Sequence, residues 1–445
     1  MSQHIVKSTE RLASVVLVAA IFITIGSFPG NLIGIPASYS RVLVWSGVFL
    51  VILSLVLMGY VNISMNKITR SGVRGAADRG FEGDELWVTY RLCNSGLIPI
   101  GPIEIFLVYP EHLRLSKGSR RAFIMIPPRG CATYKAAFEA RTGRHLIGPL
   151  RIVVRDPLGL FRSDEIDVGE PVELLVLPRL IPSSLRSSLL LARSIGMARS
   201  RISGSGTEFL SVREYREGDE PRRIVWRHTA RWGRLIVKET EKEASGNIFY
   251  ILLIAGDMFT GPYRETPFEN AARIIATMSR YSASRGDAMF LALYSRETID
   301  LVGPSRGLGG YRSILSRMAR ISFSQDTVVS DIDPRPLTKL LMRNLKGGDI
   351  VLLFTAPSRD SSAVVTAIER IERTVRNAGG SFYTVIPTPS LDLARRLDLG
   401  SKIKLMEMLK DSMALAKELR GRGVNAININ QGRIITLARL IEMTS

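Results

Sequence analysis

Residues 248–254 read IFYILLI, an uninterrupted apolar run. A strand inside a parallel sheet is covered on both faces, so it does not alternate apolar and polar residues as a half-exposed strand does. Comparable runs occur at residues 288–294, 350–354 and 382–386, and a weaker one, interrupted by two asparagines, at 424–429. Amphipathic stretches lie between them at residues 269–284, 361–377 and 405–420. This alternation predicts a doubly wound, mostly parallel α/β domain over residues 246–445, with 424–429 as an edge strand and any ligand beyond the carboxyl ends of the strands.

The preceding region, residues 76–180, has the period of two that half-buried strands show. Leu86, Val88 and Tyr90 alternate with more polar neighbours. Further short runs of this kind occur at residues 103–109, 123–126, 132–138 and 150–154. Turn sequences separate the runs, and the pattern predicts a small antiparallel β-sandwich without a catalytic constellation.

Cys93 and Cys131 are the only cysteines of the chain. Two cysteines are too few for a disulfide scaffold, and no Cys/His cluster indicates a structural zinc. We therefore predict two free, buried thiols.

The N-terminal region contains two charge-free runs, residues 12–28 and 42–63. At about 1.5 Å per residue, the second run would reach roughly 33 Å, which is enough to cross a bilayer. Pro29 and Pro36 interrupt the connector, so the runs predict a transmembrane helical hairpin over residues 1–75. A cleaved signal peptide is the alternative, but no clear small-residue cleavage site is present and the second run would stay unexplained.

Basic residues near the ends of the two runs predict the orientation of the hairpin. Only Arg41 lies between the runs, whereas several Lys and Arg residues lie just outside them. By the positive-inside rule, both termini and residues 64–445 are expected on the cytoplasmic side of the cell membrane. The low number of cysteines agrees with a reducing compartment. The outer basic residues are Lys7, Arg11, Lys67, Arg70, Arg74 and Arg79.

The chain has 445 residues, 46% of them hydrophobic, and its 60 Lys and Arg against 41 Asp and Glu give a net charge of +19. This composition excludes a disordered or collagen-like chain. The positive charge favours the anionic lipid bilayer as a partner. Nucleic acid ranks behind it, because the 13 basic residues between Arg186 and Glu243 are mixed with 8 acidic ones. No DNA- or RNA-binding motif accompanies them, so specific nucleic-acid binding is not expected.

Residues 181–245 form a predicted linker followed by the densest charged and aromatic segment of the chain. The spacing of arginine, carboxylate, tyrosine and tryptophan within residues 204–241 permits bidentate guanidinium–carboxylate pairs and stacking on aromatic rings. Two interpretations stay open. The segment is either a partner-binding surface or a buried ion-pair and stacking network between the sandwich and the α/β domain, where an unpaired charge would be costly. The residues to which the two interpretations give different roles are Arg213, Asp219, Arg222, Trp226 and Arg231.

The same segment resembles the hallmark of the domain of unknown function 58 family, which runs G-x-G-x-E-F, R-x-Y-x-x-G-D, R-x-I-x-W and A-R-x-G. Residues 144–148, 156–161 and 176–179 also resemble that family, so the likeness extends over about residues 78–445. The matching residues are our candidate interaction or interdomain residues. They are Gly204, Gly206, Glu208, Phe209, Arg213, Tyr215, Gly218, Asp219, Arg222 or Arg223, Ile224, Trp226, Ala230, Arg231 and Gly233.

The resemblance implies a membrane-tethered protein with a β-rich domain, the charged motif and a C-terminal von Willebrand factor type A-like domain. It also implies that the protein works alongside a MoxR-type AAA+ ATPase, as a chaperone-like adaptor in the assembly or activation of other complexes.

Type A domains often bind Mg²⁺ through a D-x-S-x-S loop after the first strand, together with oxygen ligands from later loops. Here residues 255–259 read AGDMF and residues 355–357 read TAP, so two of the strongest ligands are missing and a standard metal site is not expected. Asp257, Thr260 or Asp360 could bind an ion in another arrangement, but solvated acids at loop ends are the favoured interpretation.

No complete catalytic set is present in the sequence. His228 lies beside acidic residues and could be imagined as a general base, yet no nucleophile has a G-x-S-x-G context, so a hydrogen-bonding structural role is favoured. His4, His112 and His145 form no cluster. The glycine-rich stretch 303–310 lacks the Lys-Ser/Thr of a phosphate-binding loop, so an ordinary loop and no nucleotide hydrolysis are expected.

Together these observations predict a non-enzymatic, membrane-tethered interaction protein that needs no cofactor. Two alternatives remain: an enzyme that uses the segment 204–241, and a structural protein of the cell envelope.

Overall fold

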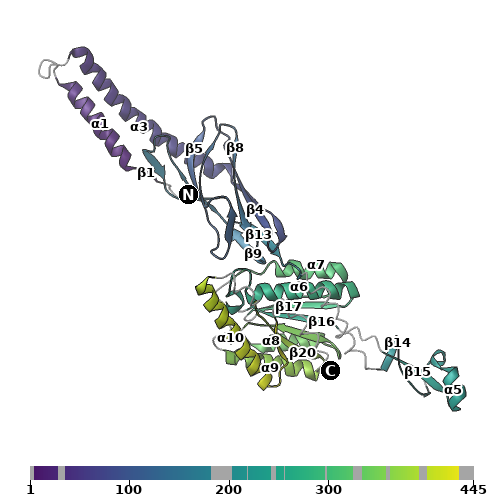
Figure 1. Ribbon diagram of the computed structural model, residues 1–445. Helices are drawn as coiled ribbons and strands as arrows, with labels where there is room; N and C mark the ends of the chain where they lie inside the picture. The colour runs from purple at the N-terminus through teal and green to yellow at the C-terminus, as the bar shows by residue number, and fades with distance from the viewer. Residues whose placement is uncertain are drawn as a thin grey trace. The chain divides into compact units, whose positions relative to one another are not determined.

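The computed structural model describes residues 5–28, 36–181, 203–217, 219–241, 247–254, 256–295, 298–323, 333–356, 361–389 and 398–429 (Figure 1). By its internal contacts the chain divides into two compact units. The first comprises Met1–Ala140 and Arg144–Val176, and the second comprises Arg141–Gly143 and Leu177–Ser445. The predicted linker between residues 182 and 202 lies outside the described residues.

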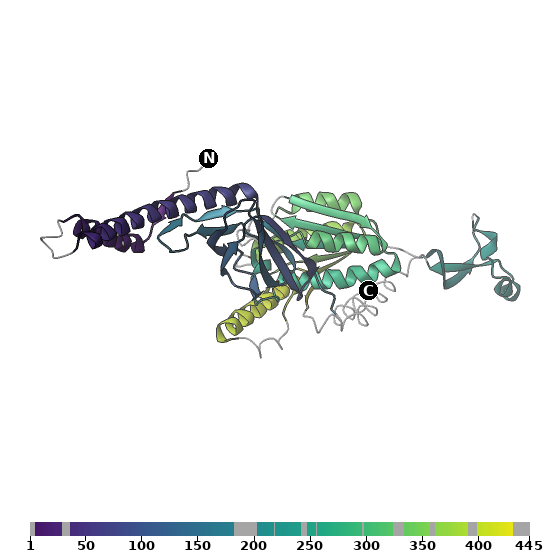
Figure 2. The same cartoon turned by 90° about the horizontal axis from the view of Figure 1, so that it is seen from above.

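Two apolar helices begin the first unit. α1 spans Glu10–Ser27 and α3 spans Ala37–Ser71, and both are long and apolar enough to cross a membrane. They lie side by side in two perpendicular views (Figures 1 and 2). A Cβ atom on Gly47 would lie 2.6 Å from Ile23 Cγ1, and one on Gly26 would lie 2.8 Å from a backbone oxygen of α3. The glycines therefore let the two backbones approach as closely as small residues do in membrane helices.

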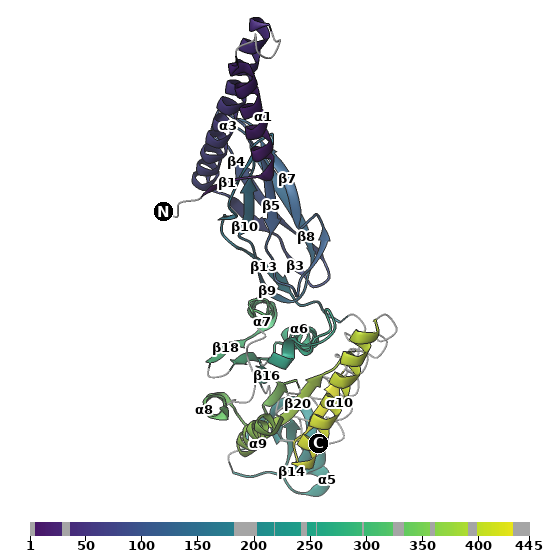
Figure 3. The same ribbon diagram turned by 90° about the vertical axis from the view of Figure 1, so that its left-hand side faces the viewer.

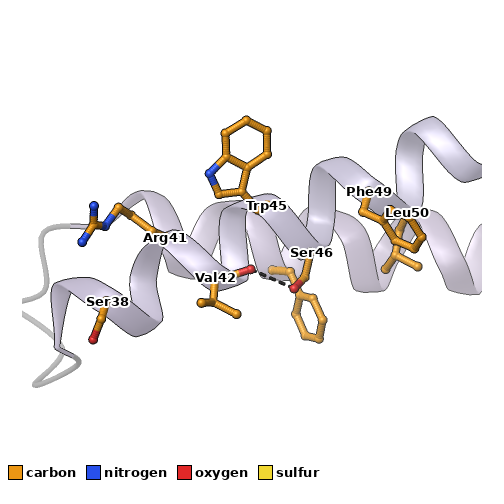
Figure 4. A pocket seen from close by; sticks show the side chains of 8 residues that line it. Ser38, Arg41, Val42, Trp45, Ser46, Phe49 and Leu50 are labelled. Carbon is orange, nitrogen blue, oxygen red and sulfur yellow. Dashed lines mark hydrogen bonds between the residues drawn. The ribbon is translucent and has the colours of Figure 1, made fainter.

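Large apolar side chains cover the outside of this hairpin. Trp45 is 71% exposed and Phe49 is 62% exposed. They border an open hollow of about 710 Å³, to which α1 contributes Phe22 and α3 contributes Arg41 (Figure 4). Aromatic and basic side chains of this kind are enriched where a membrane helix meets the aqueous phase. The exterior of the hairpin is thus suited to contact with lipid.

The base of the hairpin packs into the β-rich part of the first unit. Met65, near the end of α3, belongs to the core of the sheets. Leu57 packs with Leu160 and Phe161 in a smaller apolar cluster. The N–H of Thr9, just before α1, donates to the carbonyl oxygen of Leu160 at 2.9 Å. The segment that resembles the family signature at residues 156–161 therefore joins the sheets to the helices.

The sheets of the first unit surround one apolar core. Their strand orders are β12-β10-β5-β7, β2-β4-β8-β6, β3-β13-β9 and β1-β11. β4 alternates buried and exposed residues, as the period of two predicts. The bounds are β1 Val6–Ser8, β2 Arg74–Ala77, β3 Arg79–Phe81, β4 Glu85–Cys93, β5 Ile100–Leu107, β6 Arg114–Lys117, β7 Arg121–Ile126, β8 Cys131–Glu139, β9 Gly143–Ile147, β10 Leu150–Val154, β11 Phe161–Ser163, β12 Ile166–Val168 and β13 Val172–Leu177.

The prediction of free, buried thiols is wrong. Cys93 at the end of β4 lies opposite Cys131 at the start of β8, with the Cα atoms 4.0 Å apart, and the two residues form a disulfide. Cys131 is exposed. The residues are 38 positions apart in the sequence, so only the strand register brings them together. Low cysteine usage therefore no longer supports a reducing compartment, and the predicted orientation rests on the Lys/Arg asymmetry alone.

The second unit contains a sheet with the strand order β18-β17-β16-β19-β20-β21. Neighbouring strands are parallel except for β17 and β18, which are antiparallel. β16 lies inside the sheet and is buried throughout, as its apolar run predicts. Among the strands that the structure describes, β21 lies at an edge of the sheet, which agrees with the prediction for residues 424–429. The bounds are β16 Ile248–Leu253, β17 Met289–Ser295, β18 Thr298–Ser305, β19 Ile350–Phe354, β20 Ser381–Pro387 and β21 Ala426–Ile429.

Helices cover both faces of this sheet, as Figure 3 shows. α6 (Pro267–Arg285) and α7 (Gly307–Met318) pack in one apolar core with Tyr250 and Leu252 of β16. α8 (Pro334–Asn344), α9 (Ser361–Asn377) and α10 (Leu399–Gly421) pack on the opposite face with Phe249 and Ile251. Alternate residues of one strand therefore serve two cores, which is why its sequence shows no polar positions.

Two parts of the α/β unit differ from the prediction. The sequence pattern does not predict β18, because this edge strand carries polar residues such as Thr298 and Asp300. The stretch 303–310, predicted as an ordinary loop, instead ends β18 and begins α7.

Candidate functional site

The charged motif folds as a two-stranded ribbon that carries a short helix. β14 (Ser203–Glu214) pairs antiparallel with β15 (Ile236–Glu241). Between them lie the 3-10 helix η2 (Pro221–Arg223) and α5 (Trp226–Trp232). The candidate residues of the sequence are thus brought into one small substructure.

Local hydrogen bonds hold α5 against the ribbon. Gly233 ends the helix with a left-handed backbone (φ 66°), and its N–H donates to the carbonyl oxygen of Thr229. The Thr229 hydroxyl accepts from the N–H of Ile236 at 3.1 Å. The N–H of Val225 donates to the carbonyl oxygen of Ile236 at 2.8 Å. Both ends of α5 are therefore attached to β15.

Arg213 of β14 and Asp219, which precedes η2, form a bidentate ion pair. Nη1 and Nη2 of Arg213 each lie 2.7 Å from a carboxylate oxygen of Asp219. Asp219 Oδ2 also accepts from the N–H of Arg216 at 2.8 Å. The side chains are 33% and 19% exposed. A planar guanidinium and a carboxylate in this geometry fix a turn more firmly than a single hydrogen bond would.

The hydrogen bonds from Arg213, and next the N–H of Arg216, lower the pKa of Asp219 from 3.8 to about 2. Because the folded-state pKa is lowered, the stability that this pair contributes is present above the ordinary value and is lost as the pH falls through about 2. We expect Arg213→Ala to raise the pKa of Asp219 toward 3.8. Arg222→Ala removes an exposed arginine of the same motif and should leave that pKa unchanged. Carboxyl-carbon NMR of aspartate-labelled protein measures both values, and an unshifted Asp219 in Arg213→Ala would refute the pairing.

The rest of the motif presents an exposed aromatic and basic surface. Trp226 is 66% exposed, Trp232 is 59% exposed and Leu235 is 44% exposed. Arg227 and Arg231 are exposed as well, and α5 contains no buried residue. We call these five residues the α5 surface. Tryptophan and arginine are the side chains that most often dominate the binding energy of protein interfaces.

His228 does not have the predicted hydrogen-bonding role. The residue is exposed, and its side chain forms no hydrogen bond within the part of the chain that the structure describes. Its ring meets Trp232 edge to face, with the centroids 6.3 Å apart.

The structure places the predicted motif residues in different environments. Arg213 and Asp219 pair with each other, whereas Arg222, Trp226 and Arg231 are exposed. Gly218 and the side chains of residues 203–211, which include Glu208 and Phe209, lie outside the described residues. The backbone of Gly204 and Gly206 runs in β14, and the N–H of Tyr215 donates to the carbonyl oxygen of Leu235.

Sequence reasoning missed Trp232 and Leu235 as members of the α5 surface. The sequence of α5, WRHTARW, shows that a second tryptophan lies close to Trp226, but it does not show that either ring is exposed.

The loop after β16, where a type A domain would hold its metal, is filled by apolar side chains. The 3-10 helix η3 (Gly256–Phe259) contains Met258, which is 1% exposed. The Phe259 ring packs against Phe268 and Phe323 at centroid distances of 5.3 and 5.0 Å. Within the described ranges, no group of three or more His, Cys, Asp or Glu side chains could hold a metal ion. Asp360 lies outside those ranges.

A buried ion pair lies at the start of α6, at the carboxyl end of the sheet. Arg141 and Glu269 are 6% and 0% exposed, and their side chains meet at 2.8 Å (Nε–Oε1) and 3.1 Å (Nη2–Oε2). Glu269 also accepts from the N–H and the hydroxyl of Thr266, which completes a capping box. The Arg141 guanidinium lies over the rings of Tyr263 and Phe323. The buried charges at the start of α6 are thus paired with each other, and the cation is stacked on aromatic rings.

The prediction that the histidines lie apart is wrong for His112 and His145, which contact each other. Their rings meet in the first unit, with His112 Nε2 and His145 Nδ1 3.0 Å apart. His145 is 1% exposed. One nitrogen must donate and the other accept, so at least one ring is neutral. The 33 residues between them conceal the contact in the sequence.

The structure thus defines a protein with two apolar N-terminal helices, many strands in several sheets, and a C-terminal α/β region that carries the charged motif. A family model described as "Protein of unknown function DUF58" matches residues 211–386. The match runs from the end of β14 into β20, and it confirms the resemblance to this family over these residues. The similar stretches between residues 144 and 209 lie outside the match. No curated protein matches the chain.

Several solved structures share weak likeness with the chain. A non-cellulosomal cohesin from Archaeoglobus fulgidus is 13% identical and has a TM-score of 0.17; the alignment covers 24% of this chain and 91% of the cohesin. A Bacillus subtilis protein is 9% identical and has a TM-score of 0.20; the alignment covers 84% of this chain and 80% of that protein. A GH20 exo-β-N-acetylglucosaminidase from Vibrio harveyi is 9% identical and has a TM-score of 0.18; the alignment covers 76% of this chain and 59% of the enzyme. Scores this low carry no argument about fold or function.

Proposed function

We propose that this chain is a non-enzymatic, membrane-tethered adaptor that binds a MoxR-type AAA+ ATPase through the α5 surface. The observation that carries the proposal is the exposure of Trp226 and Trp232 on a turn that the Arg213–Asp219 pair holds in place. Exposed tryptophans are costly in water unless a partner covers them. Arginines beside them would pair with carboxylates of that partner and add specificity.

The proposed architecture assigns a role to each part of the chain. α1 and α3 span the cell membrane twice, and the Lys/Arg asymmetry of their flanks puts both termini in the cytoplasm. The α/β unit is a von Willebrand factor type A-like domain, which the strand order with one antiparallel strand beside β17 supports. It would serve as a protein-binding scaffold, since the loop after β16 holds apolar side chains where that class of domain binds its ion.

The α5 surface can be tested by affinity recovery of the full-length protein, solubilised gently from its membrane, with mass spectrometry of the proteins that accompany it. We expect a MoxR-type ATPase whose recovery depends on nucleotide. The double variant Trp226→Ala, Trp232→Ala should lower that recovery at least about tenfold. Truncating a hot-spot tryptophan commonly costs about 2 kcal/mol or more of binding free energy.

The matched control is Trp87→Ala, which removes a partly exposed tryptophan from β4, outside the motif. Its recovery of the ATPase should equal that of the wild type. If no ATPase accompanies the wild-type protein, or if all three proteins recover it equally, the proposed partner or the assigned surface is wrong.

A further inference from the structure

A second charged site lies in the first unit, at the base of the helical hairpin. It is a hollow of about 470 Å³ lined by residues of β1, β5, β7, β10 and β11 and by residues that directly follow β10 and β11. Its charged lining consists of four cations and three carboxylates: Lys7, Arg121, Arg155, Arg162, Glu104, Asp164 and Glu165. We call it the basic hollow.

The basic hollow borders the segment that connects the sheets to the helices. Lys7 of β1 lies opposite Arg162 of β11 in the antiparallel register. The preceding residue of β11, Phe161, packs instead into the apolar cluster with Leu57 of α3. Neighbouring side chains of a strand point to opposite faces, so this ribbon presents apolar groups to the hairpin and cations to the hollow. α1 begins at Glu10, three positions after Lys7.

The cations of the hollow exceed the carboxylates that they meet. Glu104 is 1% exposed and pairs with both Arg121 and Arg155, so one carboxylate faces two guanidinium groups. Arg162 forms no ion pair with any residue that the structure describes. The fourth cation, Lys7, pairs with Asp164, with 2.5 Å between Nζ and Oδ1. A third carboxylate of the lining, Glu165, pairs with Arg151. Four cations and three carboxylates therefore leave the lining with one excess positive charge.

The hollow also contains an unused hydrogen-bond donor. Arg155 Nη2 donates to Glu104 at 2.6 Å, whereas Arg155 Nε is buried and has no hydrogen-bond partner among the described residues. A buried donor without an acceptor is costly, and the cost disappears when an anion accepts from it. Tetrahedral oxyanions are suited to several guanidinium groups at once, because each oxygen accepts from a different fork.

We propose that the basic hollow binds the phosphate group of an anionic lipid headgroup. The position of the hollow close to the start of α1 favours a lipid phosphate over soluble phosphate. The charge-free run of α1 begins at Leu12, five positions after Lys7, so Lys7 would lie where the headgroups of a bilayer lie. The inference rests on the membrane anchoring given above and goes beyond the adaptor role, since it assigns a ligand to the first unit.

Binding can be measured by calorimetry on full-length protein in a neutral detergent, titrated with short-chain phosphatidylglycerol, with short-chain phosphatidylcholine and with inorganic phosphate. We expect phosphatidylglycerol to bind more tightly than the other two. Arg162→Gln should weaken that binding about fivefold, which is the effect of one cation at a membrane surface. The substitution lies on an exposed position and breaks no ion pair, so the fold should persist.

Arg79→Gln is the matched control. Arg79 is an exposed arginine of β3 in the same unit, follows α3, and lies outside the hollow. It should change the affinity less than twofold. Equal weakening by both variants would show that diffuse charge attracts the lipid, and the hollow would lose its role. Equally tight binding of inorganic phosphate, sensitive to Arg162→Gln, would overturn the lipid source.

Glu104→Gln gives a test of opposite sign. The substitution removes the carboxylate that competes for Arg121 and Arg155, so phosphatidylglycerol should bind more tightly than to the wild type. Weaker binding by a variant that keeps the wild-type melting temperature would contradict the charge balance described here. Should this variant fail to fold, the comparison of Arg162→Gln with Arg79→Gln decides alone.

Membrane anchoring is tested separately, by extraction of native membranes with alkaline carbonate. Release of the protein would contradict the two spans, whereas retention without selective phosphatidylglycerol binding would contradict only the basic hollow. Failure of the anchoring and failure of the lipid site are therefore distinguishable.

Discussion

Glu269→Ala is expected to lower the free energy of unfolding of the second unit by about 3–5 kcal/mol, because it leaves the Arg141 guanidinium buried without its counter-ion. The two side chains are 0% and 6% exposed, so water cannot replace the lost carboxylate. The substitution also removes the acceptor of the Thr266 N–H and hydroxyl at the start of α6. Hydrogen exchange of the α6 amides in the full-length protein, followed in increasing denaturant, measures the loss.

The control for this prediction is an ion pair on the surface of the same unit. Asp300 and Arg317 are 39% and 36% exposed, and Asp300→Ala should cost less than about 1 kcal/mol. The double variant Arg141→Met, Glu269→Leu should lose less than the sum of the two single changes, because no unpaired charge is then buried. A cost for Glu269→Ala as small as that for Asp300→Ala would show that the pair at α6 is not the stabilising contact described here.

Gly47→Leu is expected to separate the two apolar helices. A Cβ atom at this position would lie 2.6 Å from Ile23 Cγ1 and 2.8 Å from the carbonyl oxygen of Ala19, so a leucine does not fit unless α1 moves away. Without a hydrophobic driving force between helices in lipid, close packing is what associates them. We expect the loss of most cross-linking between cysteines introduced at facing positions of α1 and α3.

Gly59→Leu is the matched control, since it lies in the same helix and a Cβ atom there meets nothing within 4 Å. It should leave cross-linking at the wild-type level. Equal cross-linking in both variants would mean that the helices do not pack through Gly47. Carbonate extraction of both variants would then show whether separation of the helices also releases the protein from the membrane.

The strands of the α/β unit could be predicted where burial alone decides the residue type. β16 is covered by helices on both faces, so each of its positions must be apolar and the run is visible in the sequence. β18 is exposed along an edge, which removes this requirement, and its polar residues give no strand pattern. The difference between the two strands is one of environment and not of backbone preference.

The motif shows a comparable division. The pairing of Arg213 with Asp219 follows from residue types that are six positions apart and joined by one turn, so it is accessible from the sequence. The exposure of Trp226 and Trp232 is not, since an indole ring is as common in a core as on an interface. Only the three-dimensional course of the chain shows that nothing within the ribbon covers them.

The sequence by itself determined the two apolar helices, the β-rich region, the α/β region and the family motif, because each depends on hydrophobic period or on spacing within a few residues. Only the tertiary structure decided which distant residues meet. The Cys93–Cys131 disulfide, the His112–His145 contact and the Arg141–Glu269 pair join positions 38, 33 and 128 residues apart. Strand register and packing set these distances, and neither is encoded in a local pattern of side chains. The basic hollow also depends on tertiary structure, because β1 and β11, which pair there, lie far apart in the sequence of the first unit.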